Sequence, residues 1–366
     1  MTVPLHHIRK LGYGTYGTVD LVKWRGRRYA RKVYGDSYCS SAIRELALLR
    51  SLSHPHIVKL EEVFFTGDKI SALFELADGE LLEKLSPIGN LDRIITAAHS
   101  LLSALRCFHE RGLVHGDLSA PNLLVSDGVL KVADFGSTRR AGREGFLTQT
   151  TWWRAPEVIA DLKFEPCIDM WSVGVHLYEW LFDEMVTTED DESGMMTDIL
   201  SRVGVGRDWR HASKTPNAPL PHRRRLPSYC QGKHYRALSD LLYGCLCVDD
   251  AKRWTVNQAL KSQLFAGLVT PVATWQLRSE PVLPPLPAEA DNEVPNAATR
   301  LHNAFREEWG TLIPSSSQID AALIYIARCL YAHEEEHCDN PEDPVPEIVT
   351  VLTALDFQLY FEQPQV

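Results

Sequence analysis

The sequence predicts an α+β protein of two lobes, a small β-rich amino-terminal lobe with one helix and a larger α-helical lobe, plus a helical carboxy-terminal extension. Three observations predict this class. Short β-rich runs broken by glycine fill residues 7–73, apolar residues recur at spacings of three and four after residue 81, and a proline-rich stretch at 267–295 precedes a third region. A chain of 366 residues is long enough for this division.

The amino-terminal lobe is expected to hold a small sheet. Strands are predicted at 8–13, 17–24, 28–34, 60–65 and 71–75, with a helical run at 41–49. In the second lobe, the apolar residues between Ile94 and Phe108 follow the period of a buried helix, and further helices are expected at 168–182 and 235–247.

The predicted domain boundaries follow from this pattern. Residues 5–266 form the main two-lobed domain, 267–295 a proline-rich linker without an apolar period, and 296–366 a helical extension of unknown role. Helical runs are expected there at 297–309, 318–333 and 347–359.

Composition and charge exclude two classes of protein. The net charge of −10 argues against nonspecific binding to nucleic acid, and no apolar run approaches the roughly 20 residues of a membrane span. No charged-then-apolar leader opens the chain. We therefore expect a soluble intracellular protein, cytoplasmic or nuclear, with neither a membrane nor a specific nucleic acid as partner.

Three smaller features have plain interpretations. The eight cysteines are scattered without paired CxxC spacing, so we expect reduced thiols. His333, His337 and Cys338 form a cluster in an acidic stretch, which we interpret as a solvated face because no fourth metal ligand stands nearby. The basic patch at 222–225 is interpreted as a charged surface loop.

A glycine-rich stretch at residues 12–19 fits the pattern G-x-G-x-x-G-x-V. Glycines allow a hairpin backbone to approach phosphates because no Cβ stands in the way. Alone, the pattern also fits an ordinary hairpin turn. The next predicted strand carries Lys32 at the place where a lysine must reach the α- and β-phosphates of a nucleotide. Lys32 needs a carboxylate partner, for which Glu45 in the helical run is the best candidate; an ordinary solvated glutamate is the alternative.

A second group of motifs follows in the larger lobe. Residues 115–122 match H-x-D-x-x-x-x-N, which places Asp117 to orient a substrate hydroxyl and accept its proton, and Asn122 to bind a metal ion. Asp134, in an Asp-Phe-Gly sequence, would chelate the magnesium that bridges the β- and γ-phosphates. Glu157, in an Ala-Pro-Glu sequence, is expected to form a buried structural ion pair with Arg253.

In this order, the motifs resemble those of the eukaryotic protein kinases over residues 5–266, and most closely those of the cyclin-dependent kinases. The segment from Ser40 to Glu45 is similar to the cyclin-binding motif P-S-T-A-I-R-E, and residues 151–157 resemble that family's T-x-W-Y-R-A-P-E segment. Thr15 and Tyr16 look like its inhibitory phosphorylation site. The resemblance implies a bilobal protein kinase fold and transfer of the ATP γ-phosphate, with Mg²⁺, to Ser or Thr of protein substrates.

The resemblance also implies roles for individual residues. Phe74 would be the gatekeeper behind the adenine pocket, and Arg154 would help shape a pocket for a proline after the target residue. A cyclin or cyclin-like activator would contact Ser40 to Glu45 and push the Glu45 helix inward. The ATP-binding residues would be Leu11, Gly12, Gly14, Gly17, Val19, Ala30, Lys32, Phe74, Glu75, Ala77 and Leu124.

Residues 115–122 correspond, by this resemblance, to the catalytic loop of the family. This loop departs from the family at Gly116, where an arginine normally stands. In the family, that arginine contacts a phosphothreonine in the activation segment, which the Ala-Pro-Glu sequence closes. Gly116 therefore removes one of the three arginines that would bind the phosphate, while Arg44 and Arg139 remain. The segment is also short, and Gly145 stands where the phosphorylated threonine would be. We infer that activation does not depend on phosphorylation there; Thr148, Thr150 or Thr151 would be weaker substitutes.

The second departure is Ser119, which replaces a lysine and which we place among the catalytic residues with Lys32, Glu45 and Asp117. The loss of a cation near the γ-phosphate lowers turnover by about 10²–10³ if one preorganised contact is worth several kcal/mol. Serine stands at this place in some divergent viral kinases, which favours an active enzyme. The alternative is a pseudokinase scaffold that binds a cyclin or another cell-cycle partner without catalysis.

The carboxy-terminal extension resembles a cyclin box only faintly, at residues 318–330 and 351–359, and is too short for a full one. A generic helical extension that packs on the kinase is the favoured interpretation, and a cyclin-like activator within the same chain is the alternative.

Overall fold

A computed structural model describes residues 5–14, 17–35, 42, 45–46, 48–50, 52–66, 69–142, 149–160, 165–207, 209, 219–232, 234–271, 274–275 and 359–361. The chain divides into two compact units. The sheet unit comprises residues 1–53, 59–76 and 274–366, and the helical unit comprises 54–58 and 77–273.

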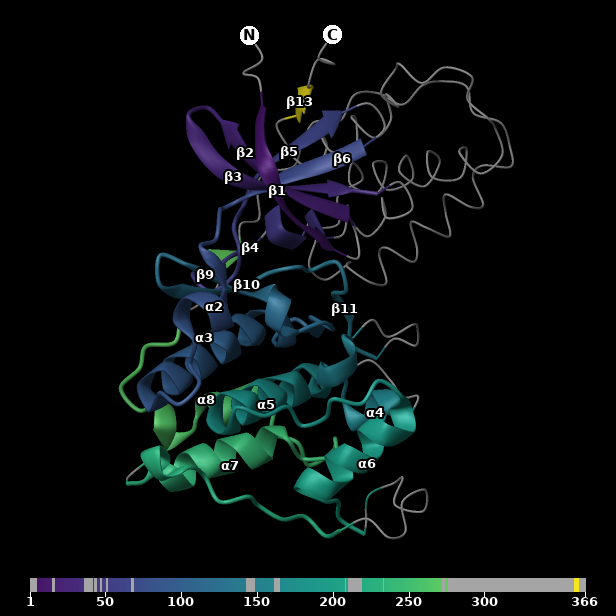
Figure 1. Cartoon of the computed structure of the whole chain (residues 1–366), viewed down its shortest axis with the longest axis vertical. Helices are drawn as coiled ribbons and strands as arrows, with labels where there is room; N and C mark the ends of the chain where they lie inside the picture. The colour runs from purple at the N-terminus through teal and green to yellow at the C-terminus, as the bar shows by residue number, and fades with distance from the viewer. Residues whose placement is uncertain are drawn as a thin grey trace, which may run out of the picture. The chain divides into compact units, whose positions relative to one another are not determined.

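The sheet unit is built on a six-stranded sheet with the order β1-β2-β3-β6-β5-β13 (Figure 1). Adjacent strands are antiparallel except β5 and β13, which run parallel. All five predicted strands are present, with ends that differ from the prediction by at most two residues. Their bounds are β1 (His6–Gly14), β2 (Gly17–Trp24), β3 (Arg27–Tyr34), β5 (Leu60–Thr66) and β6 (Lys69–Phe74).

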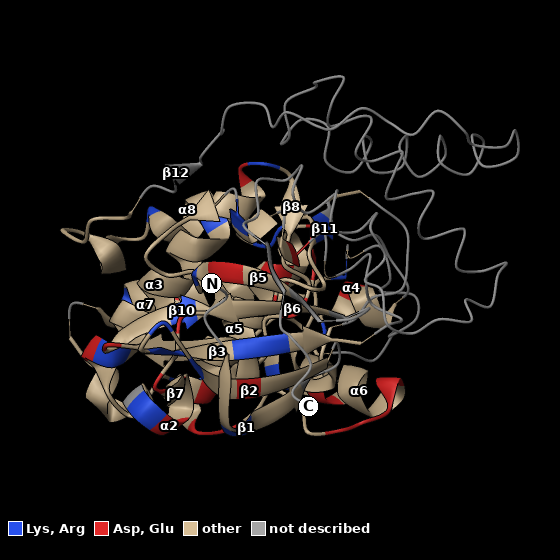
Figure 2. Ribbon diagram, turned by 90° about the horizontal axis from the view of Figure 1, so that it is seen from above, with Lys and Arg blue, Asp and Glu red and all other residues tan. Residues whose placement is uncertain are grey.

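The strands form because apolar and polar residues alternate along them. In β2, Val22 and Trp24 are buried and Lys23 between them is exposed, as the period of two requires. Val22 and Trp24 pack with Phe64 and Leu73 in one apolar cluster. Figure 2 shows Lys and Arg along β3, in which Arg27 and Arg28 are exposed and Lys32 is buried.

The sixth strand differs from the sequence prediction. β13 (Leu359–Phe361) pairs with β5, and Leu359 lies opposite Val63. The helix predicted at 347–359 therefore does not include its last residue, because the Leu-Tyr-Phe run pairs with a strand edge instead. The rest of that helix, and those predicted at 297–309 and 318–333, lie outside the described residues.

The run that carries Glu45 is helical at residues 42, 45–46 and 48–50. Ala42, Glu45, Leu46 and Leu49 are buried at spacings of three and four, which is the pattern of one helix face. The chain then enters β4 (Leu52–Ser53), which pairs antiparallel with β12 (Thr274–Trp275).

The helical unit has α3 and α5 at its centre (Figure 1). The side chain of Asn90 caps the amino terminus of α3 by accepting the Arg93 N–H. The helices are α2 (Leu81–Leu85), α3 (Leu91–His109), α4 (Pro156–Ile159), α5 (Cys167–Phe182), α6 (Glu192–Val203), α7 (Tyr235–Cys245) and α8 (Val256–Leu260). The three helices predicted in this part of the chain are all present.

Short strands and 3-10 turns connect these helices. The strands are β7 (Gly79–Glu80), β8 (Leu113–Val114), β9 (Leu123–Ser126), β10 (Val129–Val132) and β11 (Arg139–Arg140). The 3-10 helices are η2 (Ala120–Asn122), η3 (Thr151–Trp153), η5 (Ser228–Cys230) and η6 (Gln263–Phe265).

Glu157 and Arg253 form the buried ion pair that the sequence predicts. Arg253 Nη2 lies 2.8 Å from Glu157 Oε2, and both residues are at most 4% exposed. The guanidinium also donates to the carbonyls of Cys167 and Cys247. Loss of one partner would leave a buried charge unpaired, at a cost of about 3–5 kcal/mol.

The chain after η6 stays packed on α3. Thr270 Oγ1 lies 3.0 Å from His99 Nε2, and Arg106 Nη2 donates to the Pro271 carbonyl over 3.1 Å. These contacts fall inside the linker predicted to begin at residue 267, and that boundary stays a prediction.

Within the described ranges, no helix combines the length and the apolar character that a membrane span requires. In the same part of the chain, no group of three or more His, Cys, Asp or Glu side chains is arranged to hold a metal ion.

Candidate functional site

The first part of the site is the glycine-rich hairpin of the sheet unit. Gly12 lies opposite Val19, and Gly14 lies opposite Gly17. Gly17 has a φ of +153°, and a Cβ there would lie 1.9 Å from the Val33 carbonyl oxygen, so the fold requires glycine at this position. A Cβ at Gly12 would meet no atom within 4 Å, so packing does not explain that glycine. Thr15 and Tyr16 lie outside the described residues.

The hairpin is adjacent to the predicted lysine. Val19 of β2 lies opposite Lys32 of β3. Lys32 Nζ donates to both carboxylate oxygens of Glu45, over 3.1 and 2.9 Å, and Tyr34 donates its hydroxyl to Glu45 over 3.1 Å. Glu45 is 2% exposed, so the solvated-glutamate alternative is wrong for this residue. The structure brings the predicted pair together, and its catalytic role stays a prediction.

The other predicted ATP-binding residues of this unit follow along the sheet. Ala30 lies opposite the buried Phe74. Glu75 donates its backbone N–H to the Lys59 carbonyl over 3.0 Å, so this N–H already has an acceptor within the chain, and the predicted contact of Glu75 with the base stays a prediction. Leu11 is on β1 and is 38% exposed.

Two further predicted residues, Ala77 and Leu124, belong to the helical unit. Leu124 is in β9, opposite Glu80 of β7 and Lys131 of β10. Ala77 immediately precedes the segment in which Asp78 donates its N–H to the Val125 carbonyl, so both residues are fixed to one small sheet.

Asp169, in the first turn of α5, fixes the backbone of the catalytic loop. Its fully buried carboxylate accepts the N–H groups of His115 and Gly116 over 2.8 and 2.9 Å and lies 2.9 Å from His109 Nε2. The sequence analysis did not identify this anchoring role. A buried acid at the start of an apolar helix was the available signal, because such a carboxylate needs donors.

Gly116 adopts a φ of +80° between these two anchored residues. Glycine takes this left-handed conformation without steric cost, whereas a residue with a Cβ is strained there. The position where the resemblance described above leads one to expect an arginine therefore has a local backbone reason to accept glycine.

Asp117 is held at both carboxylate oxygens. Thr150 donates its hydroxyl and its N–H to Oδ1 over 2.7 and 3.1 Å, while Asn122 Nδ2 lies 3.3 Å from Oδ2 and 2.9 Å from the Asp117 carbonyl oxygen. Burial raises the pKa of Asp117, the bonds from Thr150 oppose this rise, and the nearby carboxylate of Asp134 adds to it. The sequence analysis considered Thr150 only as a phosphate acceptor and missed this contact.

Asn122 also connects the loop to the segment before Asp134. Its Nδ2 lies 3.3 Å from Ser119 Oγ, and its carbonyl accepts the Ala133 N–H over 2.9 Å. Because the amide nitrogen faces Asp117 and Ser119, the amide oxygen is directed away from them. Asp134 has a φ of +56°, and its Oδ1 accepts the Gly136 N–H over 3.3 Å.

His115 supports the same loop from the interior. Its Nδ1 accepts the Asp117 N–H over 3.3 Å, and its Nε2 lies 3.2 Å from the Ala133 carbonyl oxygen. Burial lowers the pKa of His115, which favours the neutral imidazole that this pattern requires. The ring packs on Phe135 at 4.9 Å between centroids, and Phe135 packs on Phe108 at 5.1 Å.

The segment before the Ala-Pro-Glu sequence is fixed to α5 by Gln149. This side chain is 2% exposed, donates toward the Ile168 carbonyl and the Ser172 hydroxyl, and accepts the Ala155 N–H. Arg154 donates to the Gln149 carbonyl over 3.3 Å. The Gln149 carbonyl therefore already has a donor from within the chain.

Arg139, which with Arg44 remains of the three arginines that would bind the phosphothreonine, contacts the backbone, and its role in binding a phosphate stays a prediction. Its Nη1 donates to the carbonyls of Gly136 and Thr138 over 3.1 and 2.8 Å. Arg44 and Gly145 lie outside the described residues.

Comparison with known proteins agrees with this geometry. A family model described as the protein kinase domain matches residues 5–265. The chain is 28% identical over 282 residues to a protein named as a serine/threonine-protein kinase in Acanthamoeba polyphaga mimivirus, a match that covers 69% of this chain and 50% of that protein. It is 30% identical over 287 residues to a cell division control protein 2 homologue of Trypanosoma brucei brucei, covering 70% of this chain and 81% of the relative. The chain thus spans about half the length of the mimivirus relative.

Proposed function

The chain belongs to the protein kinase domain family, and from this premise we propose that it is a proline-directed Ser/Thr kinase of the cyclin-dependent type. It transfers the γ-phosphate of ATP to protein substrates, and its activation does not require phosphorylation of the activation segment. The observation that carries the proposal is Asp117, whose carboxylate is half-buried and oriented by Thr150 and Asn122.

Asp117 has the chemistry of the group that receives the substrate hydroxyl proton. Both of its oxygens accept hydrogen bonds, so the carboxylate is fixed in direction before the substrate arrives. Phosphoryl transfer depends mainly on positioning and on stabilisation of charge, so a fixed acceptor is what the reaction needs.

Asn122 and Asp134 are the residues that would hold Mg²⁺. The atoms that would coordinate the ion are one amide oxygen and one carboxylate. This set suits Mg²⁺, which binds one or two protein oxygens and otherwise keeps water and phosphate ligands. When bound, Mg²⁺ neutralises charge on the β- and γ-phosphates. Lys32, fixed by both oxygens of Glu45, is the residue of this chain that would pair with the α- and β-phosphates.

Proline selectivity is supported by the contact between Arg154 and the Gln149 carbonyl. Because the Gln149 carbonyl already accepts a hydrogen bond, it is less able to accept one from the N–H of the residue after the target Ser or Thr. A proline has no N–H to satisfy, so it loses nothing there. Other residues leave a donor unpaired, which costs binding free energy.

Independence from activation-segment phosphorylation is supported by Gly116 and Arg139. Gly116 carries no side chain to meet a phosphate, and Arg139 donates to two backbone carbonyls. The proposed activator is a cyclin or cyclin-like protein that contacts Ser40 to Glu45, of which the structure describes Ala42 and Glu45. Its effect would be to favour the state in which Glu45 pairs with Lys32.

The alternative function is a pseudokinase scaffold that binds a cyclin or another cell-cycle partner. The observation that favours it is the absence of two cations from the catalytic loop, at Gly116 and Ser119. Nucleotide binding does not separate the two functions, because both folds bind nucleotide. Turnover separates them.

The test is transfer of labelled γ-phosphate from Mg-ATP to Ser-Pro and Thr-Pro peptides and to histone H1, with and without added cyclins. Asp117→Asn is the control for contaminating activity. Matched peptides with Ala after the target residue test the selectivity. Arg154→Met should reduce the ratio of the rate with the Pro peptides to the rate with the Ala peptides. Phosphate transfer by the parent protein that is lost in Asp117→Asn establishes the kinase. Equal signals from the parent and the variant under every condition contradict the kinase and favour the pseudokinase scaffold.

A further inference from the structure

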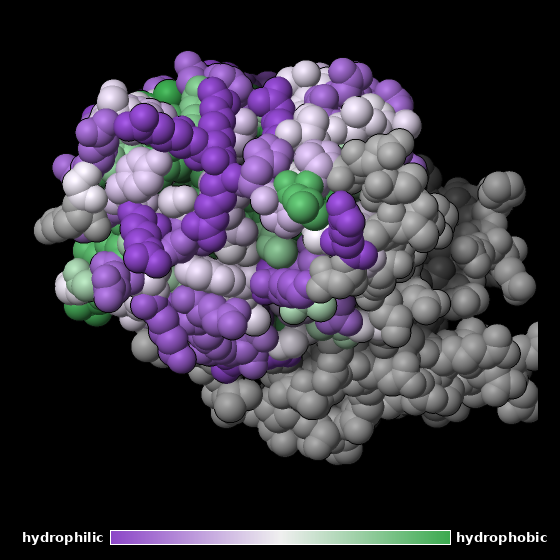
Figure 3. All heavy atoms as spheres, turned by 90° about the horizontal axis from the view of Figure 1, so that it is seen from below, coloured by the Kyte–Doolittle hydropathy of each residue, from purple (hydrophilic) through white to green (hydrophobic). Residues whose placement is uncertain are grey.

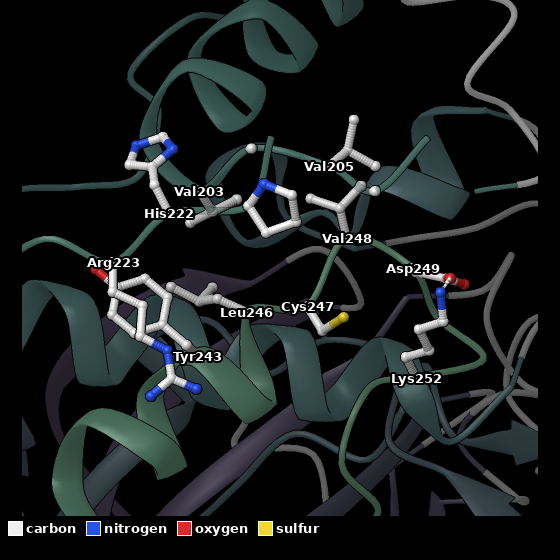
Figure 4. Close-up of a pocket in the computed structure, with 13 residues that line it drawn as sticks. Val203, Val205, His222, Arg223, Tyr243, Leu246, Cys247, Val248, Asp249 and Lys252 are labelled. Carbon is white, nitrogen blue, oxygen red and sulfur yellow. Dashed lines mark ion pairs between the residues drawn. The ribbon is translucent and has the colours of Figure 1, made fainter. Parts of the chain in front are cut away.

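A pocket of about 330 Å³ lies in the helical unit, and none of the residues that line it is assigned above to catalysis (Figure 4). It opens where the chain leaves α6 and α7, and its volume lies at the lower end of the range for ligand pockets. The lining residues are Val203, Gly204, Val205, Gly206, Pro221, His222, Arg223, Tyr243, Leu246, Cys247, Val248, Asp249 and Lys252.

One wall of the pocket is built from two paired segments. Val205 donates its N–H to the Pro219 carbonyl over 2.8 Å, and His222 donates to the Val203 carbonyl over 3.3 Å. Gly204 between them has a φ of +67°, and a Cβ there would lie 2.2 Å from the Leu220 carbonyl oxygen. The wall is therefore held by backbone contacts that require a glycine.

The base of the pocket is apolar. Val203, Val205, Leu246 and Val248 are each at most 5% exposed. Cys247 is half-buried and its thiol is free. A cavity with these walls suits an aliphatic or aromatic side chain of another molecule, since such a side chain leaves water on entering it.

The rim of the pocket is basic on two sides. Figure 4 places His222 and Arg223 on one side and Lys252, paired with Asp249, on the other. The side chains of Arg223 and Lys252 remain 54% and 55% exposed although each has an acidic neighbour. The exposed Arg224 and Arg225 follow directly, so the basic patch of residues 222–225 borders an apolar pocket in a chain whose net charge is −10.

The apolar base of the pocket contrasts with a surface that is mostly hydrophilic. Figure 3 shows the lower face as largely hydrophilic, with hydrophobic residues in small separate patches. An apolar cavity with a basic rim is complementary to a peptide that presents an apolar side chain among carboxylates. A nucleic acid would satisfy the rim but not the apolar base.

We propose that this pocket docks an extended segment of a protein substrate, in which one apolar side chain enters the cavity and flanking Asp or Glu residues meet Arg223 and Lys252. This inference rests on the proposed kinase function and adds a second contact between enzyme and substrate. Such a contact raises the local concentration of the target residue, so it lowers KM and leaves kcat unchanged.

The first experiment measures binding without catalysis. The probe is a fluorescein-labelled twelve-residue peptide with one leucine among glutamates, titrated against the full chain by fluorescence polarisation. Control peptides carry alanine for the leucine or lysines for the glutamates. We expect the probe to bind at least tenfold more tightly than either control; equal binding of all three overturns the proposal.

Two pairs of variants locate the binding. Cys247→Phe fills the pocket and should weaken binding at least tenfold, whereas Cys247→Ser should bind as the parent protein does. Arg223→Ala with Lys252→Ala removes the rim cations, and Arg236→Ala with Lys261→Ala removes two exposed cations of the same unit as the matched control. Thermal unfolding identifies any variant that fails to fold. Unchanged binding in the folded rim variant contradicts the proposal even if Cys247→Phe does not fold.

The kinetic experiment separates this proposal from the proposed function. A Ser-Pro substrate fused to the probe should show a KM several-fold lower than the unfused substrate at the same kcat, and the rim variant should lose only that difference. If no substrate is phosphorylated, the kinase proposal fails and the polarisation result still decides the pocket.

The remaining occupant to distinguish is the chain itself. Residues 334–349 contain seven acidic residues and no Lys or Arg. A synthetic peptide of this segment is therefore titrated alongside the probe. If it alone binds in a pocket-dependent way, the occupant is the carboxy-terminal region of this chain, and docking of a separate substrate is overturned.

Discussion

The two units carry their parts of the candidate site with different chemistry. In the sheet unit, Lys32 is held by a complete buried ion pair with Glu45. In the helical unit, Asp117 is held by uncharged donors from Thr150 and Asn122, and the loop around it has no cation at positions 116 and 119.

This difference separates the binding of ATP from the transfer of its phosphate. Under the proposed function, Lys32 of the sheet unit, fixed by Glu45, would pair with the α- and β-phosphates. Under the same proposal, the helical unit orients Asp117 as the proton acceptor but would supply less positive charge near the γ-phosphate, because positions 116 and 119 carry no cation. We therefore expect a kinase that binds nucleotide normally and turns over slowly.

The largest effect is expected from Asp117→Asn. Asparagine keeps the shape and can still meet Thr150, but it cannot accept the substrate proton. Phosphate transfer should fall by about 10²–10⁴, the usual contribution of a general base. Radiometric assays measure the rate, and nucleotide binding measured by calorimetry should remain within a factor of about three. A variant that retains the parent rate would remove Asp117 from the mechanism.

Glu45→Gln tests the charged half of the comparison. The amide keeps the size but removes the charge that fixes Lys32, so kcat/KM for ATP should fall by about 10²–10³, the worth of one preorganised electrostatic contact. Glu61→Gln is the matched control, because it breaks the exposed pair with Lys59 in the same sheet and should leave the kinetics unchanged. Equal kinetics in the two variants would contradict the role of Glu45.

Ser119→Lys should restore part of the missing charge. We expect turnover to rise about tenfold, less than the 10²–10³ that a preorganised contact can supply, because Asn122 loses the Ser119 hydroxyl at 3.3 Å. Ser193→Lys adds the same charge on an exposed part of α6 and serves as the control. A fall in turnover with an unchanged ATP affinity would show that the loop is adapted to serine.

The smallest effect is expected from Thr150→Val. The hydroxyl bond lowers the pKa of Asp117 against the rise caused by burial. Its removal should raise that pKa further, so the acidic limb of the kcat/KM profile moves to higher pH and the rate near neutral pH falls a few-fold. Thr151→Val is the neighbouring control. A profile that changes in height but not in position would assign Thr150 a purely structural role.

The strands and the Lys32–Glu45 pair could be predicted because their signals are local or lie in motifs of fixed order. At the end of β2, Lys23 is exposed between the buried Val22 and Trp24, and glycines mark the hairpin of β2 with β1. The Glu157–Arg253 pair was predictable for the same reason, since both residues belong to motifs.

Contacts between distant, irregular segments could not be predicted. Thr150 meets Asp117 across 33 positions of the chain, and Asp169 meets Gly116 across 53. Neither contact has a sequence period, because each depends on how a loop without regular structure folds back on α5. The wrong assignment of Leu359 to a helix has a related cause. A short apolar run can pair with the edge of a distant strand, here β5, and the run itself does not show which strand that is.

Gly116 limits the mutational routes open to this chain. An arginine at position 116 would have to adopt a φ near the +80° of the present glycine, at a cost of about 1–2 kcal/mol. It would also contribute nothing until a phosphate acceptor stood in the activation segment. Under the proposed function, either change alone brings no benefit, so independence from activation-segment phosphorylation is easier to acquire than to reverse. Under the proposed function, a cyclin or cyclin-like partner takes the place of that phosphorylation in activating the enzyme.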